Sequence, residues 1–243
     1  MALKGIDMKL VISDLKKSFD KTEVLRGASF TFEQGRIYGL LGRNGAGKTT
    51  LFNCLNEDLR TDGGSFSLED DAGQRRPLTC DDIGYVLSTP VVPEFLTARE
   101  FIKFFLDINR GRIAFPKEPD VYLDYMQIDE SDRGKLLKDF SHGMKNKMQL
   151  LVNFIADPPV LLLDEPLTSL DVVMADEMKN LLRRRKEGHI TILSTHIMEL
   201  ALDLCDEIVI LHGGMLAPVV RDQLADEQYK DRIIAALKEE RHA

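Results

Sequence analysis

The chain has 243 residues, of which 44% are hydrophobic and 30% are charged, so it has the composition of an ordinary globular protein with enough residues for a substantial core. Its formal net charge of −8 at pH 7 argues against a broad nucleic-acid-binding face. The charged N-terminus argues against a secretory leader, and the lack of an apolar run of about 20 residues argues against a membrane span, so we expect a cytoplasmic chain. The three cysteines are too widely spaced to indicate a disulfide framework or a zinc site.

The first part of the chain is expected to form strands. Polar and apolar residues alternate from Lys9 to Phe32, which predicts antiparallel strands. The apolar run Ile37–Leu41 then indicates a short buried strand. Residues 49–56 carry apolar side chains at the spacing of one helix face, so a strand and a helix follow each other here.

A glycine-rich loop joins this strand to this helix. Residues 42–50 match the phosphate-binding pattern G-x-x-x-x-G-K-[ST]. The first N–H groups of a helix lack intrahelical partners and its dipole is positive there, so polyphosphate is the favoured ligand. A side chain at Gly45 or Gly47 would hold the backbone away from the phosphates. Lys48 would reach the β- and γ-phosphates, and the Thr49 hydroxyl would reach Mg²⁺. The candidate nucleotide-binding residues of the loop are Gly42, Arg43, Asn44, Gly45, Ala46, Gly47, Lys48, Thr49 and Thr50.

Between this helix and Pro90 we expect two further strands. Residues 61–64 have the composition of a turn, and residues 65–68 and 83–87 have that of strands. The charged residues 69–76 between them are expected to form a solvated loop.

The chain changes character at Pro90, and residues 90–157 are expected to be mostly helical, with a loop at 110–119. Residues 97–100 have the sequence of a capping box. One apolar helix face then follows, formed by Phe101, Phe104, Phe105 and Ile108. This face is either a partner surface or part of the core, and core packing is favoured because aromatic faces usually end up buried.

Strands and helices alternate again after residue 159. The apolar run Val160–Leu163 predicts a central parallel strand, residues 171–186 predict a helix, and residues 190–193 and 208–211 predict two more strands. The basic run 183–186 invites a nucleic-acid interpretation, but we favour a role in complementing the negative end of the helix. The polar residues from Asp222 onward indicate a terminal helix.

Two acids directly follow the predicted central strand. The carboxyl end of a parallel strand lies beside the crevice where ligands bind in α/β sheets. There Asp164 would hold Mg²⁺, and Glu165 would act as general base on an attacking water. Adjacent acids after a strand are commonly only the start of a loop, but behind a phosphate loop they predict nucleotide hydrolysis.

With these motifs in this order, the chain resembles the ATP-binding subunit of an ABC transporter over nearly its whole length. By this resemblance Phe19 is the aromatic residue that stacks on adenine. Phe140–Met144 resembles the family signature Leu-Ser-Gly-Gly-Gln. Residues 169–171 resemble the loop after the acidic strand, and Asp171 of this loop is counted with the nucleotide site. His196 resembles the switch histidine, which contacts the γ-phosphate and holds the water and Glu165 in line.

The signature has a physical logic of its own. Ser141 and Gly143 precede a helix with an apolar face, so they lie at a second positive helix start. The resemblance implies that this helix start faces the γ-phosphate bound by a second copy, which closes two ATPs in a homodimer or a heterodimer. Alternatively, Ser141 only caps the helix. The two roles are compatible, because backbone N–H groups would do much of the binding.

Two places depart from the family pattern. Ser88 follows the predicted strand 83–87 where the family usually has Gln, and its shorter side chain can still meet Mg²⁺ or water. His142 and Met144 stand where Gly and Gln are usual, and this variant of the signature resembles exporter branches. Ser141 and Gly143, which the proposed phosphate contact requires, are both present.

Together these features predict an α/β fold, with a P-loop NTPase core built on a mixed sheet, an antiparallel β layer and an inserted α-helical subdomain. We expect a single ABC-type ATPase domain over residues 1–243. Residues 1–89 and 158–220 would form the core, residues 90–157 the helical signature subdomain and residues 221–243 a helical tail.

The resemblance implies Mg²⁺-dependent ATP hydrolysis that powers a separate membrane-spanning permease, with export favoured. The permease would dock between residues 88–96 and the helical subdomain, and would hold the chain at the inner face of the membrane. Two alternatives stay open. A soluble ABC-type ATPase of nucleic acid or translation usually carries a coiled coil, a zinc module or tandem halves. A P-loop small-molecule kinase does not require the signature helix.

Overall fold

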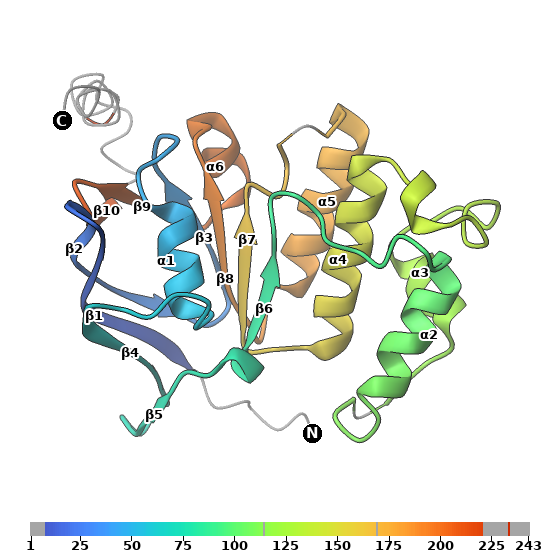
Figure 1. Ribbon diagram of the computed structural model, residues 1–243, viewed down its shortest axis with the longest axis horizontal. Coiled ribbons are helices and arrows are strands. Elements are labelled where there is room, and N and C mark those ends of the chain that lie inside the picture. The colour runs from blue at the N-terminus through green and yellow to red at the C-terminus, as the bar shows by residue number, and fades with distance from the viewer. Residues whose placement is uncertain (1–7, 114, 169, 221–232, 234–243) are drawn as a thin grey trace.

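The computed structural model describes residues 8–113, 115–168, 170–220 and 233. It contains an antiparallel sheet and a mostly parallel sheet, with helices packed beside them (Figure 1). The expected mixed α/β fold is thus confirmed. The antiparallel sheet has the order β2-β1-β4-β5. Its strands are β1 (Lys9–Phe19), β2 (Thr22–Glu33), β4 (Gly63–Glu69) and β5 (Arg75–Pro77).

The second sheet has the order β10-β9-β3-β8-β7-β6. All of its neighbouring pairs are parallel except β10 and β9. All five residues of β7 are buried, as the apolar composition of a central parallel strand requires. The strands are β3 (Arg36–Leu41), β6 (Ile83–Val86), β7 (Val160–Asp164), β8 (Ile190–Thr195), β9 (Glu207–His212) and β10 (Met215–Val219).

Six α-helices and two short 3₁₀ turns are assigned in the described residues. Capping side chains mark the starts of three of them. Thr97 accepts a hydrogen bond from the Glu100 N–H and completes the expected capping box, and Ser141 and Asp171 cap the next long helices. The elements are α1 (Lys48–Leu55), η1 (Cys80–Asp82), α2 (Ala98–Ile108), α3 (Pro119–Tyr125), η2 (Leu137–Asp139), α4 (His142–Ala156), α5 (Val172–Arg185) and α6 (Met198–Leu204).

The parallel sheet separates two apolar cores. Because successive side chains of a strand point to opposite faces, Leu161 and Leu163 of β7 join one core while Val160 and Leu162 join the other. The first core includes residues of α2, α4, α5 and α6, and the second includes residues of α1 and the antiparallel sheet. The sheet therefore holds α1 on one face and the signature helix α4 on the other.

Two expectations for local structure were wrong, and two elements were missed. Residues 75–77 form the edge strand β5 instead of a loop, because Asp70 accepts hydrogen bonds from the N–H groups of Ala72 and Gln74 and so closes a hairpin turn. On α2, the side chains of Phe104 and Ile108 are 52% and 61% exposed, so this part of its apolar face is outside the core. Helix α6 and strand β10 were not predicted.

Basic residues at the end of α5 bond to other elements of the chain, whereas their expected role at the negative end of α5 itself stays a prediction. Arg183 donates to Asp203, Arg185 to the Phe154 carbonyl and Lys186 to Asp206. The expected tail helix, apart from residue 233, and Ser169 of the loop before α5 lie outside the described residues. The boundaries between core and helical subdomain stay a prediction. None of the helices in the described ranges is both long enough and apolar enough to span a membrane.

Candidate nucleotide-binding site

The phosphate loop wraps the start of α1. Gly45 and Gly47 have φ of +85° and +100°, in the left-handed region that favours glycine. Gly47 is the N-cap of α1 and supplies no side-chain cap, so the first N–H groups of the helix stay available to an anion. A Cβ at Gly45 would meet no atom within 4 Å, so this side of the loop faces open space.

Lys48 folds back over the loop that precedes it. Its Nζ donates to the carbonyl oxygens of Gly42 at 2.7 Å and Arg43 at 3.1 Å. The same ammonium lies 3.4 Å from Glu165 Oε1, and the side chain is 6% exposed. The loop therefore holds a positive charge where polyphosphate would bind, beside the acidic end of β7.

Asp164 links α1 to the sheet. The Thr49 hydroxyl, at the start of α1, donates to Asp164 Oδ2 at 2.8 Å. The other carboxylate oxygen accepts from the Ser194 hydroxyl of β8 at 2.6 Å, and Asp164 is buried. A hydroxyl and a carboxylate side by side are the oxygen donors with which proteins hold Mg²⁺ next to bound phosphates, so this pair fits the expected metal.

Glu165 is held at four points. Its φ of +48° is unusual for a residue with a side chain, and its N–H donates to Ser194 Oγ at 2.9 Å. Its carboxylate accepts from the Thr168 hydroxyl at 3.0 Å, and the His196 Nδ1 lies 3.1 Å from each carboxylate oxygen. With Lys48 as fourth contact, the expected base and the expected switch histidine lie together.

A pocket of about 320 Å³ joins these groups to more distant residues. Phe19 lines it from the end of β1 with a side chain that is 43% exposed, and Ser88 lines it after β6. Lys17 Nζ lies 5.3 Å from the centre of the Phe19 ring. The structure therefore brings the expected adenine contact and metal residues to one cavity. The full lining is Phe19, Val24, Asn44, Gly45, Gly47, Lys48, Thr49, Thr50, Ser88, Asp164 and Glu165.

The signature residues do not line this pocket. Ser141 is exposed and accepts from the Met144 N–H at 3.2 Å, so it does cap α4. Gly143 is buried under the start of α5, where an added Cβ would lie 2.3 Å from Met174 Sδ. Asp171 caps α5 by accepting from the Met174 N–H at 2.9 Å. The starts of α1 and α4 both lie toward the upper edge in Figure 1, over different parts of the molecule.

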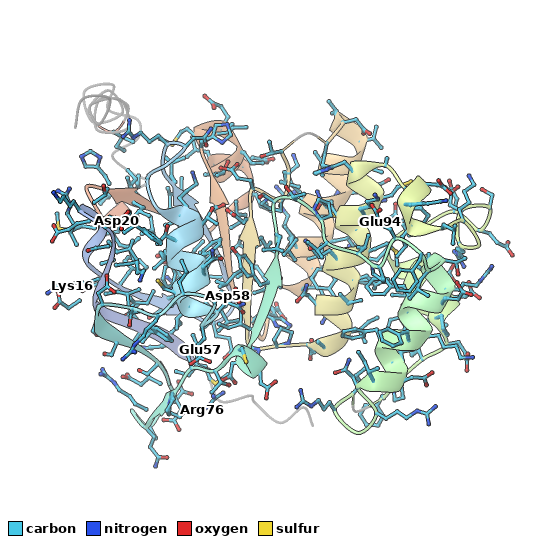
Figure 2. The ribbon with its side chains drawn as sticks, viewed as in Figure 1. Lys16, Asp20, Glu57, Asp58, Arg76 and Glu94 are labelled. Carbon is cyan, nitrogen blue, oxygen red and sulfur yellow. The ribbon has the colours of Figure 1, made fainter. Side chains whose placement is uncertain are left out.

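Side chains of α4 also hold the segment that contains Ser88. Gln149 donates to the Leu87 carbonyl and accepts from the Val91 N–H, each at 3.1 Å. Lys145 of α4 donates to Glu94 at 2.7 Å, and this hydrogen bond holds the pKa of the Glu94 carboxyl below its usual value. Figure 2 shows Glu94 beside α4. The segment after β6 thus connects the pocket to the signature helix.

Two contributors to the site were not singled out from the sequence. Ser194 touches both acids, and Thr168 touches Glu165. Ser194 lies in the Ser-Thr-His run that contains His196, so this run indicates its position but not its contacts.

Tyr85 of β6 lies behind the site. Burial, and to a lesser degree the charge of Asp164, raises the pKa of its phenol, which therefore stays neutral and donates to Asn53.

Comparisons with known proteins identify the family. A family profile described as "ABC transporter" matches residues 25–168. The Nod factor export ATP-binding protein I of Rhizobium sp. (strain N33) is 32% identical over 234 residues, which cover 92% of this chain and 74% of that protein. ATP-binding cassette sub-family A member 9 of Mus musculus is 35% identical over 217 residues, which cover 84% of this chain but 13% of that much longer protein.

A comparison of folds gives the same family. A solved structure described as "Structure of ATP binding subunit of ABC transporter" superposes with a TM-score of 0.77 at 26% identity, and the match covers 95% of this chain and 99% of that chain. The residues matched by the family profile include the phosphate loop, the signature and the acidic strand. The chain therefore belongs to the ABC transporter family.

Proposed function

We propose that the chain binds ATP with Mg²⁺ in the 320 Å³ pocket and hydrolyses it with Glu165 as general base. One observation carries this proposal: Lys48 and His196 both contact Glu165, next to a Thr49–Asp164 hydrogen bond. A cation, a metal-type donor pair and a base thus converge at one helix start. This is the set of groups that phosphoryl transfer to water requires.

Each group has a part in this proposal. Phe19 stacks on adenine, and the N–H groups of residues 42–50 bind the phosphates. Thr49 and Asp164 hold Mg²⁺, with Ser88 in reach of the metal or its water. Bound Mg²⁺ would neutralise charge that develops on the transferred phosphoryl group. His196 orients the Glu165 carboxylate toward the attacking water.

The active form is proposed to be a dimer of ATPase subunits. Ser141, exposed at the start of α4, would complete the pocket of a second copy, and Asp171 would lie at the same contact. Gly143 is buried under α5, so it would take part only through its backbone N–H. The exposure of Ser141 supports this arrangement, as does that of Val172 and Val173, which are 86% and 68% exposed beside Asp171. Exposed apolar side chains next to a ligand-binding helix start favour a protein contact there.

The chain is further proposed to act on a separate permease at the cytoplasmic face of a membrane. Val91 and Phe95, in the segment between Ser88 and α2, are 69% and 78% exposed. Because Gln149 and Lys145 tie this segment to α4, a partner docked there would sense movement of the signature helix. Export is the proposed direction, supported by the exporter-like signature and the Rhizobium exporter relative. No role for nucleic acid is proposed.

Replacing Glu165 by Gln tests the assignment. Loss of a general base is expected to slow ATP hydrolysis by about 10²- to 10⁴-fold. ATP binding should persist, and the variant should accumulate as an ATP-bound dimer in size-exclusion chromatography. Glu187→Gln serves as control, because this acid is exposed in the turn between α5 and β8. Hydrolysis by E165Q at the parent rate would show that Glu165 is not the base.

A further inference from the structure

Ser194 is completely buried in β8 and touches both acids at the end of β7. In the parallel register of these strands, Ser194 lies opposite Asp164. Its Oγ donates to Asp164 Oδ1 at 2.6 Å and accepts from the Glu165 N–H at 2.9 Å. One hydroxyl therefore connects the proposed metal ligand to the backbone of the proposed base.

The direction of these two hydrogen bonds is fixed by chemistry. A backbone N–H only donates, so it must meet a lone pair of Ser194 Oγ. The single hydroxyl proton is then free to point at Asp164, whose ionised carboxylate only accepts. Hydrogen bonds to a charged acceptor are short and strong, as the 2.6 Å distance indicates.

This arrangement fixes the orientation of the Asp164 carboxylate. One oxygen accepts from Ser194 and the other from Thr49. Because Ser194 occupies Oδ1, the oxygen beside Thr49, Oδ2, is the one that faces the pocket, where the metal is proposed to bind. Loss of the Ser194 hydroxyl would leave the buried carboxylate with fewer partners and free to rotate away from Thr49.

The same hydroxyl anchors Glu165 where its backbone is strained. A φ of +48° is costly for a residue with a Cβ, so the surrounding contacts must offset the cost. The N–H of Glu165 has its partner in Ser194 Oγ, a group fixed in the centre of the sheet. The carboxylate of Glu165 is thereby aimed toward His196 and Lys48.

We propose that Ser194 is a positioning residue for ATP hydrolysis, which orients Asp164 for the metal and Glu165 for the attacking water. It is absent from the residues that line the described pocket, so it acts through the two acids and not by touching nucleotide. This inference rests on the proposed roles of Asp164 and Glu165. A purely structural serine would affect stability but not the dependence of activity on Mg²⁺.

The test compares Ser194→Ala with Ser194→Thr, which keeps a hydroxyl. Removal of a group that orients a metal ligand typically costs about 10- to 100-fold in activity or metal affinity. We expect S194A to lower kcat by that factor and to raise the Mg²⁺ concentration needed for half-maximal activity. Binding of ATP in EDTA should be unchanged, because without metal it depends on the phosphate loop. S194T should recover much of the lost kcat.

Thr191→Val is the matched control. Thr191 is a buried hydroxyl residue of the same strand, but it lines a cavity with Pro158 and His189 at the other end of the sheet. T191V should keep both the parent kcat and the parent Mg²⁺ dependence. An equal change in T191V and S194A would overturn the inference, since it would reflect only the loss of a buried hydroxyl.

The remaining outcomes separate two kinds of failure. If the parent protein hydrolyses ATP and E165Q does not, but S194A keeps the parent kcat and Mg²⁺ dependence, Ser194 has no positioning role. If the parent and E165Q hydrolyse ATP at the same rate, the proposed role of Glu165 as general base is wrong, and the proposed function fails with it. If circular dichroism shows that S194A does not fold, the test rests on S194T. A folded but inactive S194T contradicts the inference, and a folded and active S194T supports it.

Discussion

Gly47 meets two demands at the start of α1. Its φ of +100° lies in the left-handed region, and a Cβ there would come within 2.7 Å of Val24 Cγ1. Val24 belongs to β2 and also lines the nucleotide pocket. A side chain at residue 47 would therefore push the phosphate loop away from the strand that supports it, in addition to straining the backbone.

Gly47→Ala is expected to weaken ATP binding by about tenfold or more, because hydrogen bonds to a charged group contribute about 1.5–3 kcal/mol each. Titration with a fluorescent ATP analogue measures this. Gly188→Ala is the control, since Gly188 has φ of +88° but an added Cβ there would meet no atom within 4 Å. It should cost about 1–2 kcal/mol of folding free energy and leave ATP affinity unchanged. Equal ATP affinities for G47A and G188A would argue against a phosphate loop at this glycine.

Residues of the site differ in how far the sequence predicts them. The phosphate loop and the two acids were predictable because each is a contiguous pattern whose chemistry depends on its own spacing. The contacts of Ser194 were not, because they join two strands whose residues are 30 positions apart. The covering of Gly143 by Met174 likewise depends on how α5 packs on α4, which no local pattern reveals.

Helix α2 presents apolar side chains both to the core and to the outside. Ile102 is completely buried, and Phe101 and Phe105 pack partly against the core. Phe104 and Ile108 stand on the exposed side. The helix thus resembles a core helix in sequence, although only one side of its apolar face is covered within the subunit.

Substitutions on the two sides of α2 should differ in their effect on stability. Ile102→Ala is expected to lower the free energy of unfolding by about 2–5 kcal/mol, because it leaves a cavity in a closed core. Phe104→Ser and Ile108→Ser should each change it by no more than about 0.5 kcal/mol, as is usual for surface positions. Urea unfolding monitored by circular dichroism measures all three. A cost for F104S as large as that for I102A would mean that Phe104 is packed in solution.

The elements themselves were predictable where capping and periodicity agree. The capping box at Thr97 and the buried run of β7 gave elements close to those observed. Burial of α2 was not predictable, because it depends on which elements surround the helix. The edge strand β5 was missed because its three residues are charged or exposed, and only its pairing with β4 makes it a strand.

At the scale of the whole molecule, the two helix starts expected to bind one ATP are separate. The described pocket is lined from β1, β2, the phosphate loop with the start of α1, and the ends of β6 and β7, without Ser141. Ser141 is exposed and caps α4, a helix that lies apart from α1 (Figure 1). In the described residues of one subunit, the signature therefore does not contribute to the nucleotide pocket. Pairing of two copies is the simplest way to join them.

Mixing two inactive variants tests this pairing most directly. Lys48→Ala removes the charge of the phosphate loop, and Ser141→Arg places a bulky cation at the signature, so each variant alone should hydrolyse ATP far more slowly than the parent. In a mixed dimer, the intact loop of S141R meets the intact signature of K48A. An equimolar mixture should therefore regain about a quarter of the parent's intact sites, measured as ATP hydrolysis. A mixture no more active than its separate components, or parent-like hydrolysis by S141R alone, would contradict catalysis by the pair.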